Sequence, residues 1–117
     1  MSDSELNVLR GSLDLLILKA LRWEPRHGYA VVEWIEQATD ATFLIEEGTL
    51  YPALHRLERK GWVAAEWGIS DNNRRAKFYR LTPQGRAQLV TEAPLWHRYA
   101  EAIARALRAT SPEPEAV

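Results

Sequence analysis

The sequence predicts a mainly α-helical fold with one small β-hairpin, and three observations support this fold class. Four segments repeat apolar residues at helical spacing. Two shorter segments rich in β-formers flank the turn-forming cluster at 70–73. The length of 117 residues suits one domain, and 46% hydrophobic with 26% charged residues is usual for a soluble globular protein.

The first two helices are expected at about 6–23 and 28–39. Leu13, Ile17 and Leu21 recur at helical spacing in the first, which ends at 24–25 because the residue before proline disfavours the α region. In the second helix, Val31, Trp34 and Ile35 share one face and are expected in the core. The short apolar segment 43–45 is compatible with a strand of one rung.

A third helix is expected at about 47–60. Either Gly48 or Thr49 would cap its start. Pro52 would then lie in the first turn, where a missing N–H has no helical partner to lose. Gly61 is a standard C-terminal stop. The predicted buried stripe consists of Leu50, Ala53, Leu54 and Leu57.

A hairpin of strands 62–69 and 76–81 precedes the last helix. Thr82 is the expected N-cap, Pro83 takes the first helical position, and the helix continues to about 107. Pro94 should kink this helix or split it in two. Its apolar seam has no obvious partner within one chain, so we expect pairing with a second copy. The seam residues are Leu89, Ala93, Trp96, Ala100, Ile103 and Leu107.

Three helices followed by a two-stranded wing define a winged helix-turn-helix, whose third helix enters the DNA major groove. We therefore divide the chain into a winged helix-turn-helix DNA-binding domain at 1–82 and a C-terminal dimerisation helix at 83–109. Residues 110–117 read TSPEPEAV and are expected to form a disordered tail.

The face of the third helix opposite its leucines is mostly cationic and rich in hydrogen-bond donors. At about 100° per residue, Pro52, His55, Arg56 and Arg59 point away from the stripe, with Thr49 and Tyr51 at its flanks. Arginine can read guanine or grip phosphate. For an isolated helix, a solvated charged face is the more ordinary interpretation.

The hairpin that follows is basic as well, which favours DNA over that interpretation. A basic loop tip can contact phosphates or the minor groove, although a charged hairpin can also serve to resist edge pairing. Its polar and basic residues are Asn72, Asn73, Arg74, Arg75, Lys77 and Arg80.

The net charge of −1 hides a separation of charge. Residues 51–86 hold eight Lys and Arg against three Asp and Glu, or +5, while the remaining segments hold seven against thirteen, or −6. A basic reading edge on an acidic body should weaken indiscriminate binding to phosphates and leave orientation to the third helix and the wing.

Several other classes of function lack support in the sequence. Without cysteine there are no disulfides or thiolate metal sites. His27, His55 and His97 lack metal-ligand spacing, and no nucleophile elbow or phosphate loop occurs, so neither a metal, a cofactor nor catalysis is expected. No signal peptide or membrane span is recognisable, and we expect a soluble cytoplasmic protein.

Two blocks carry a resemblance to a known family. The segments GTLYPALHRLERKGWV (48–63) and NNRRAKFYRLTPQG (72–85), supported by LRGSLDLLILKAL (9–21) and HGYAVVEWI (27–35), resemble the PadR family of bacterial transcriptional regulators. The resemblance covers about residues 6–108. It implies a winged-helix homodimer that binds operator DNA and usually represses transcription.

The resemblance also implies roles for individual residues. Thr49, Leu50, Tyr51 and Pro52 match the start of the family's recognition helix. Arg74, Arg75 and Lys77 match its wing, in which Asn73 stands where the pattern often has glycine; asparagine tolerates the positive φ needed there.

The single C-terminal helix is similar to the short subgroup, in which it pairs with the partner's N- and C-terminal helices. Some short members bind flat aromatic drugs between subunits against a tryptophan, and Trp96 lies at the corresponding place. Plain dimer packing is the alternative role for Trp96. A winged-helix protein-interaction module without a DNA role is the alternative function. The expected dimerisation residues are Leu9, Leu13, Leu89, Trp96, Ala100, Ile103 and Leu107.

Overall fold

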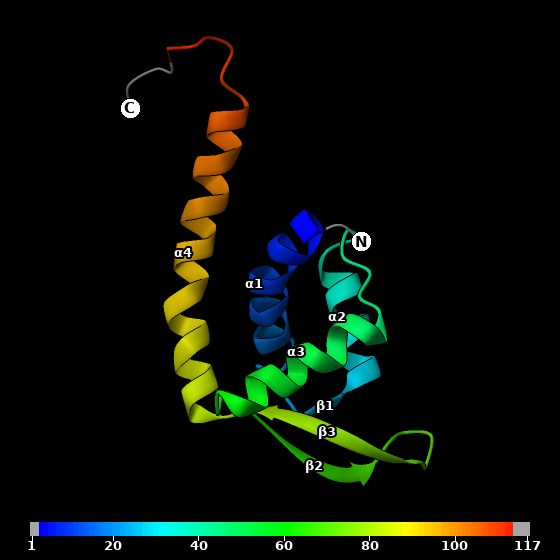
Figure 1. Ribbon diagram of the computed structural model, residues 1–117. Coiled ribbons are helices and arrows are strands. Elements are labelled where there is room, and N and C mark those ends of the chain that lie inside the picture. Colours follow the sequence, from blue (N-terminus) through cyan, green and yellow to red (C-terminus); the bar gives the residue numbers. More distant parts are fainter. Residues whose placement is uncertain (1–2, 114–117) are drawn as a thin grey trace.

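In the computed structural model, which describes residues 3–113 with side chains for 11–113, three helices are followed by a wing and a long last helix (Figure 1). This arrangement confirms the predicted fold class. The helices are α1 (Asp3–Ala20), α2 (Gly28–Ala38), α3 (Glu47–Arg59) and α4 (Pro83–Leu107). The strands are β1 (Arg26–His27), β2 (Val63–Ile69) and β3 (Arg75–Leu81).

The core lies between α1, α2, α3 and the inner end of the sheet. The predicted stripe of α3 is buried, and Val31 and Ile35 of α2 meet it, as the helical spacing predicts. Trp34 is only partly buried and packs against this core. The largest fully buried side chains include Leu13, Ile17, Leu18, Leu21, Leu50, Leu54, Leu57 and Tyr79.

The sheet is antiparallel with the order β1-β3-β2, so β3 is its central strand. Its third strand comes from a segment that the sequence did not indicate. Arg26 pairs with Tyr79 and His27 with Phe78, whereas the strand considered at 43–45 is absent. The short segment before α2 already occupies the free edge of β3. Phe43 and Ile45 instead pack into the core.

The ends of α1 and α3 differ from the predicted ones. Helix α1 ends at Ala20. Just after it, Arg22 N donates to Lys19 O, a hydrogen bond across three residues in place of the four of an α-helix. The Ala20 carbonyl is taken by the Arg26 side chain, which donates to it at 2.9 Å. Glu46, which makes no side-chain capping bond, is the N-cap of α3, so the caps expected at Gly48 or Thr49 are wrong.

Because α3 begins at Glu47, Pro52 lies inside the helix and not in its first turn. A proline there removes the hydrogen bond to the carbonyl four residues earlier, which belongs to Gly48. Gly48 is exposed, so water can bind that carbonyl.

The junction between wing and α4 follows the predicted chemistry. Thr82 caps α4 by accepting from Gly85 N at 3.0 Å, and its hydroxyl donates to Gly61 O at 2.7 Å. Gly61 and Asn73 both have positive φ, at 77° and 59°, as expected for a helix stop and a tight turn. A Cβ on Gly85 would lie 2.0 Å from Trp62 O, so only glycine permits this close approach.

Helix α4 passes through Pro94 without a break, so the predicted division of this helix is wrong (Figure 1). Pro94 costs only the hydrogen bond to the Val90 carbonyl, and both residues are exposed to water. The beginning of α4 packs beside α1, and its far end extends beyond the other helices. The described part of the predicted tail, 110–113, has no helix or strand, and 114–117 lie outside the described residues.

Candidate nucleic-acid interface

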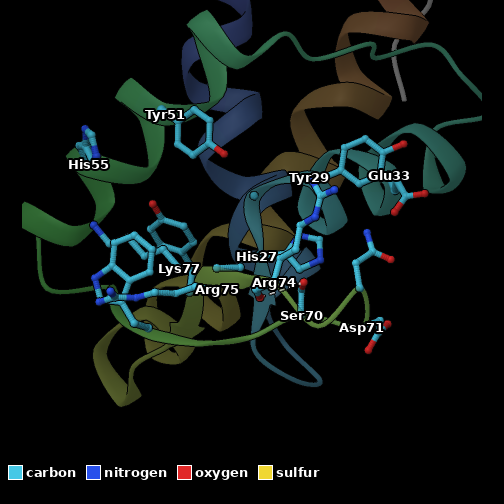
Figure 2. A pocket seen from close by; sticks show the side chains of 15 residues that line it. His27, Tyr29, Glu33, Tyr51, His55, Ser70, Asp71, Arg74, Arg75 and Lys77 are labelled. Carbon is cyan, nitrogen blue, oxygen red and sulfur yellow. Dashed lines mark hydrogen bonds between the residues drawn. The ribbon is translucent and has the colours of Figure 1, made fainter.

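An open groove of about 790 Å³ separates α3 from the wing, and we call it the α3–wing groove (Figure 2). It is lined from three sides: by the start of α2, by α3, and by β2, β3 and the turn between them. The residues that were predicted to bind DNA and that line this groove are basic or can donate hydrogen bonds. The predicted DNA-binding residues that line it are Tyr51, His55, Arg74, Arg75 and Lys77.

Helix α3 presents its side chains to this groove because its opposite face is held in the core. Leu50, Leu54 and Leu57 are at most 1% exposed, which fixes the rotation of the helix about its axis. Tyr51 and His55 consequently lie on the groove side. The exposed face also carries Pro52 and Arg59, and Thr49 is half-buried at its edge.

Arg56 departs from the predicted arrangement. Its guanidinium makes a bidentate ion pair with Asp14 of α1, with Nε 3.4 Å from Oδ2 and Nη2 bonded to Oδ1. Its side chain is 26% exposed. Arg56 lies at the flank of the helix, about 110° from the buried stripe, where a long side chain can turn back to α1. The expectation that Arg56 points away from the buried stripe like Pro52, His55 and Arg59 is therefore wrong for its side chain, which turns back to Asp14.

The wing residues differ in how firmly they are held. The guanidinium carbon of Arg75 lies 4.6 Å from the centre of the Trp67 ring, a cation–π geometry. Lys77 Nζ is 3.8 Å from Glu58 Oε1 of α3 and thereby connects the wing to that helix. Arg74 and Asn73 are exposed at the turn.

The turn itself is closed by Ser70. Its backbone N–H donates to Arg74 O at 2.8 Å, its hydroxyl donates to the same oxygen at 3.1 Å, and Asn73 N donates to Ser70 O at 2.9 Å. These bonds fix the backbone from which the Arg74 side chain extends.

The groove also contains residues that the sequence reasoning did not assign to it. Gly28, Tyr29 and Glu33 of α2 line one side, and Trp67 lies on the wing. The strand register could have indicated Trp67, because it pairs with Lys77 and shares a face with Ile69, Arg75 and Tyr79. No local signal indicated that α2 reaches the groove, since this depends on the pairing of β1 with β3.

One ionisable group in the groove has a shifted pKa. Burial raises the pKa of Tyr79, and the nearby Glu58 carboxylate and Tyr51 add smaller effects in the same direction. Tyr79 is 2% exposed, so its phenol stays neutral at physiological pH and serves as a wall of the groove.

The residues proposed for dimerisation fall into two sets. Leu13 and Leu89 are buried in the core of their own chain, whereas Ala100, Ile103 and Leu107 are exposed on α4. Trp96 is 38% exposed and packs on α1, where a Cβ on Gly11 would be 3.6 Å from its Cζ2. Leu9 belongs to α1, but its side chain lies outside the described residues.

Among the described side chains, those of residues 11–113, no cluster of three His, Asp or Glu could hold a metal ion. Nor is any helix within residues 3–113 both long and apolar enough to cross a membrane.

The three-helix unit, its wing and the basic groove between them define a winged-helix protein of the DNA-binding type. Residues 17–91 match the transcriptional regulator PadR-like family, and the chain belongs to this family. Its members regulate transcription by binding DNA and are not enzymes.

The chain is also similar to individual proteins and to solved structures of regulators. The chain is 37% identical over 98 residues to an uncharacterized protein of Lysinibacillus sphaericus, covering 83% of this chain and 89% of the relative. The crystal structure of a PadR family regulator from Eggerthella lenta shares 34% identity and a TM-score of 0.71, covering 92% of this chain and 91% of that one. A regulator from Clostridium thermocellum shares 32% identity and a TM-score of 0.73, covering 84% and 95%.

Proposed function

We propose that the protein is a homodimeric, sequence-specific repressor that binds operator DNA through the α3–wing groove. The observation that carries this proposal is that Tyr51 and His55 of α3 line one groove together with the basic wing residues Arg74, Arg75 and Lys77. All of them belong to residues 51–86, whose formal charge is +5. The excess positive charge attracts DNA, and the fixed rotation of α3 presents donors to base edges.

The contacts divide into two groups. Tyr51, His55 and Arg59, with Thr49 and Pro52 at the start of the helix, meet bases or adjacent phosphates in the major groove. Asn73, Arg74, Arg75 and Lys77 anchor the wing on phosphates or in the minor groove. Arg56 supports the helix through Asp14 and makes no phosphate contact in this arrangement.

The dimer proposal rests on the outer half of α4. Ile103 and Leu107 are large, apolar and exposed, and they continue the seam that begins at Leu89 inside the chain. A two-fold axis through paired α4 helices implies a pseudo-palindromic operator with half-sites about one helical turn apart, or a multiple of it. Such a regulator would act in the cytoplasm.

An effector site at the two-fold axis is a further part of this proposal. Two Trp96 rings facing each other across the axis could hold a planar aromatic molecule and release the repressor. Quenching of tryptophan fluorescence by a panel of planar aromatics tests this. If Trp96→Ala leaves the quenching intact, Trp96 is not the ligand platform.

The DNA-binding proposal is tested by titrating a duplex from the gene's own upstream region at several salt concentrations. Replacing Arg74 and Arg75 by alanine should weaken binding to all sequences alike and reduce the slope of log K against log salt by about 2, since each phosphate contact contributes about 0.9. Arg105→Ala, an exposed arginine on α4, is the matched control and should leave the slope unchanged. An unchanged slope for the double variant would remove the wing from the contact surface.

The competing function is a protein-interaction module without a DNA role. The position of Tyr51 and His55 of α3 beside the basic wing in one groove counts against it. Absence of any mobility shift at low salt would contradict the repressor proposal and favour this alternative.

A further inference from the structure

We propose that Gly28 is a positioning residue for Tyr51, and that the tyrosine held in this way determines sequence specificity. Gly28 is the first residue of α2, and Tyr51 lies in the first half of α3. The specificity role rests on the proposed DNA-binding function, whereas the positioning role depends only on the contact between the two residues.

The contact leaves no space for a side chain at position 28. A Cβ on Gly28 would lie 2.8 Å from the Tyr51 hydroxyl oxygen and 3.1 and 3.2 Å from Cζ and Cε1 of the ring. These distances are shorter than ordinary van der Waals contact. The hydroxyl end of the ring therefore lies directly on the backbone of Gly28, and an alanine there must displace it.

The backbone at Gly28 does not itself require glycine. Among the described glycines, only Gly61 has a positive φ, so Gly28 has a conformation open to any residue. Alanine is ordinarily preferred over glycine within a helix. The space occupied by Tyr51 is therefore the structural reason for a glycine at this position.

The Gly28 backbone is itself firmly held. The preceding residue, His27, pairs with Phe78 of β3, and its ring packs on the ring of Phe78 at a centroid distance of 5.6 Å. His27 Nδ1 also accepts the Ala30 N–H at 3.2 Å and so caps α2. Tyr51 thus rests on a point that is fixed to the sheet and to a helix start.

Tyr51 lines the α3–wing groove, and Gly28 forms part of the same groove wall. Tyr51 is 38% exposed, and Figure 2 shows the ring leaving α3 with the hydroxyl directed into the groove. Tyr51 makes no hydrogen bond with the described residues and is held by its packing on Gly28, whereas His55 and Arg74 have neither a hydrogen bond nor an ion pair of their side chains with the described residues.

Because Tyr51 is held and His55 and Arg74 are not, we assign the tyrosine and the basic residues different tasks in DNA binding. A neutral side chain with one geometry can discriminate between base sequences because a wrong sequence leaves its hydroxyl unpaired. Being neutral, it releases no counterions and adds nothing to the salt dependence. The unheld basic residues can follow phosphates on any sequence.

The specificity role is tested with a duplex selected from a random pool by the wild-type protein and with a scrambled duplex of equal composition. Tyr51→Ala should lower the ratio of the two affinities about tenfold and leave the salt slope unchanged. Gly28→Ala should produce a similar loss because it displaces the ring. The double variant should then bind no worse than Tyr51→Ala alone.

A thermal unfolding cycle tests the positioning role without DNA. Gly28→Ala should lower the Tm of the wild-type protein but leave unchanged or raise the Tm of the Tyr51→Ala variant, because the clash is then gone. Gly48→Ala is the matched control: a Cβ at this glycine in the first turn of α3 meets nothing within 4 Å.

Two outcomes would overturn the inference. Additive Tm changes in the Gly28 and Tyr51 variants would overturn the positioning role even if DNA binding is intact. A pool that yields no preferred sequence would overturn the proposed function together with the specificity role. The Tm cycle would in that case decide the positioning role by itself.

Discussion

Neighbouring residues in the wing have different surroundings. Arg75 stacks on Trp67, a residue that is 60% exposed, whereas Arg74 extends from the turn that Ser70 closes. A stacked guanidinium keeps its charge and its in-plane donors while losing much of its freedom. We therefore expect Arg75 to orient the wing and Arg74 to adapt to the backbone that it meets.

The buried Tyr79 predicts a loss of stability at alkaline pH. Its pKa is raised above the ordinary value of 10.0, chiefly by burial, so the folded state holds this proton more tightly than the unfolded state does. The stabilisation is fully present below pH 10 and is lost as the pH rises through the folded pKa. Denaturant titrations between pH 9 and 11.5 should show the free energy of unfolding falling less steeply for Tyr79→Phe than for wild type.

The matched control for this experiment is Tyr29→Phe, because the Tyr29 side chain is 69% exposed. This variant should follow the wild-type dependence on pH. Identical slopes for wild type and Tyr79→Phe would mean that Tyr79 does not contribute to the alkaline transition.

Between elements, the ion pair of Asp14 and Arg56 connects α1 to α3. Both side chains are mostly buried, at 16% and 26% exposure, so solvent screens the pair less than a surface pair. Asp14→Asn should lower the free energy of unfolding by about 1.5–3 kcal/mol, the range for a hydrogen bond to a charged group. Chemical denaturation of Asp14→Asn, Arg56→Met and the double variant measures the coupling between the two residues.

The Arg56→Met variant also tests whether Arg56 only supports α3 or contacts DNA as well. Arg56→Met should leave the slope of log K against log salt unchanged, since Arg56 is already paired with Asp14. A slope reduced by about 1 would mean that Arg56 leaves Asp14 and binds a phosphate. The pair of Arg26 and Glu24, at 3.6 Å, offers a comparison: the Glu24 side chain is 65% exposed, so the pair should contribute less than about 1 kcal/mol.

Local patterns were sufficient to predict most elements. Helical spacing indicated the buried face of α3, and Thr82, Gly61 and Asn73 occupy the cap, stop and turn that their chemistry favours. Nonlocal contacts were not predictable in this way. The strand at Arg26 exists because β3 offers it an edge, and the orientation of Arg56 depends on Asp14, 42 residues away.

The candidate site likewise combines features that local patterns predicted with features that depend on nonlocal packing. Tyr51, His55 and the wing cations, all named from the sequence as candidate DNA contacts, line one groove, whereas Arg56 and Arg59 of the same set do not. The sequence indicated Gly28 only as the start of the second helix, because its contact with Tyr51 depends on how α2 and α3 pack. Periodicity identifies the face that a helix exposes, but it does not identify which neighbour limits a side chain on that face.

On the scale of the whole molecule, α4 makes the chain unusually extended. Its radius of gyration is 16.7 Å, compared with about 13 Å for a compact domain of this length, and its longest dimension is 59 Å. The protruding half of α4 exposes Tyr99, Ile103 and Leu107. Monomeric proteins rarely leave so many large apolar side chains together in water, which supports a partner for this surface.

Placing a charge on the α4 seam should therefore separate the proposed dimer. Ile103→Glu buries a carboxylate against the partner helix, so light scattering at micromolar concentration should change from the dimer to a monomer of about half that mass. Ala102→Glu adds the same charge to an exposed position off the seam and should leave the dimer intact. The monomer should retain weak binding to half-sites, because the α3–wing groove lies within one chain. A wild-type mass of 13.4 kDa, or equal masses for wild type and Ile103→Glu, would refute pairing through this seam.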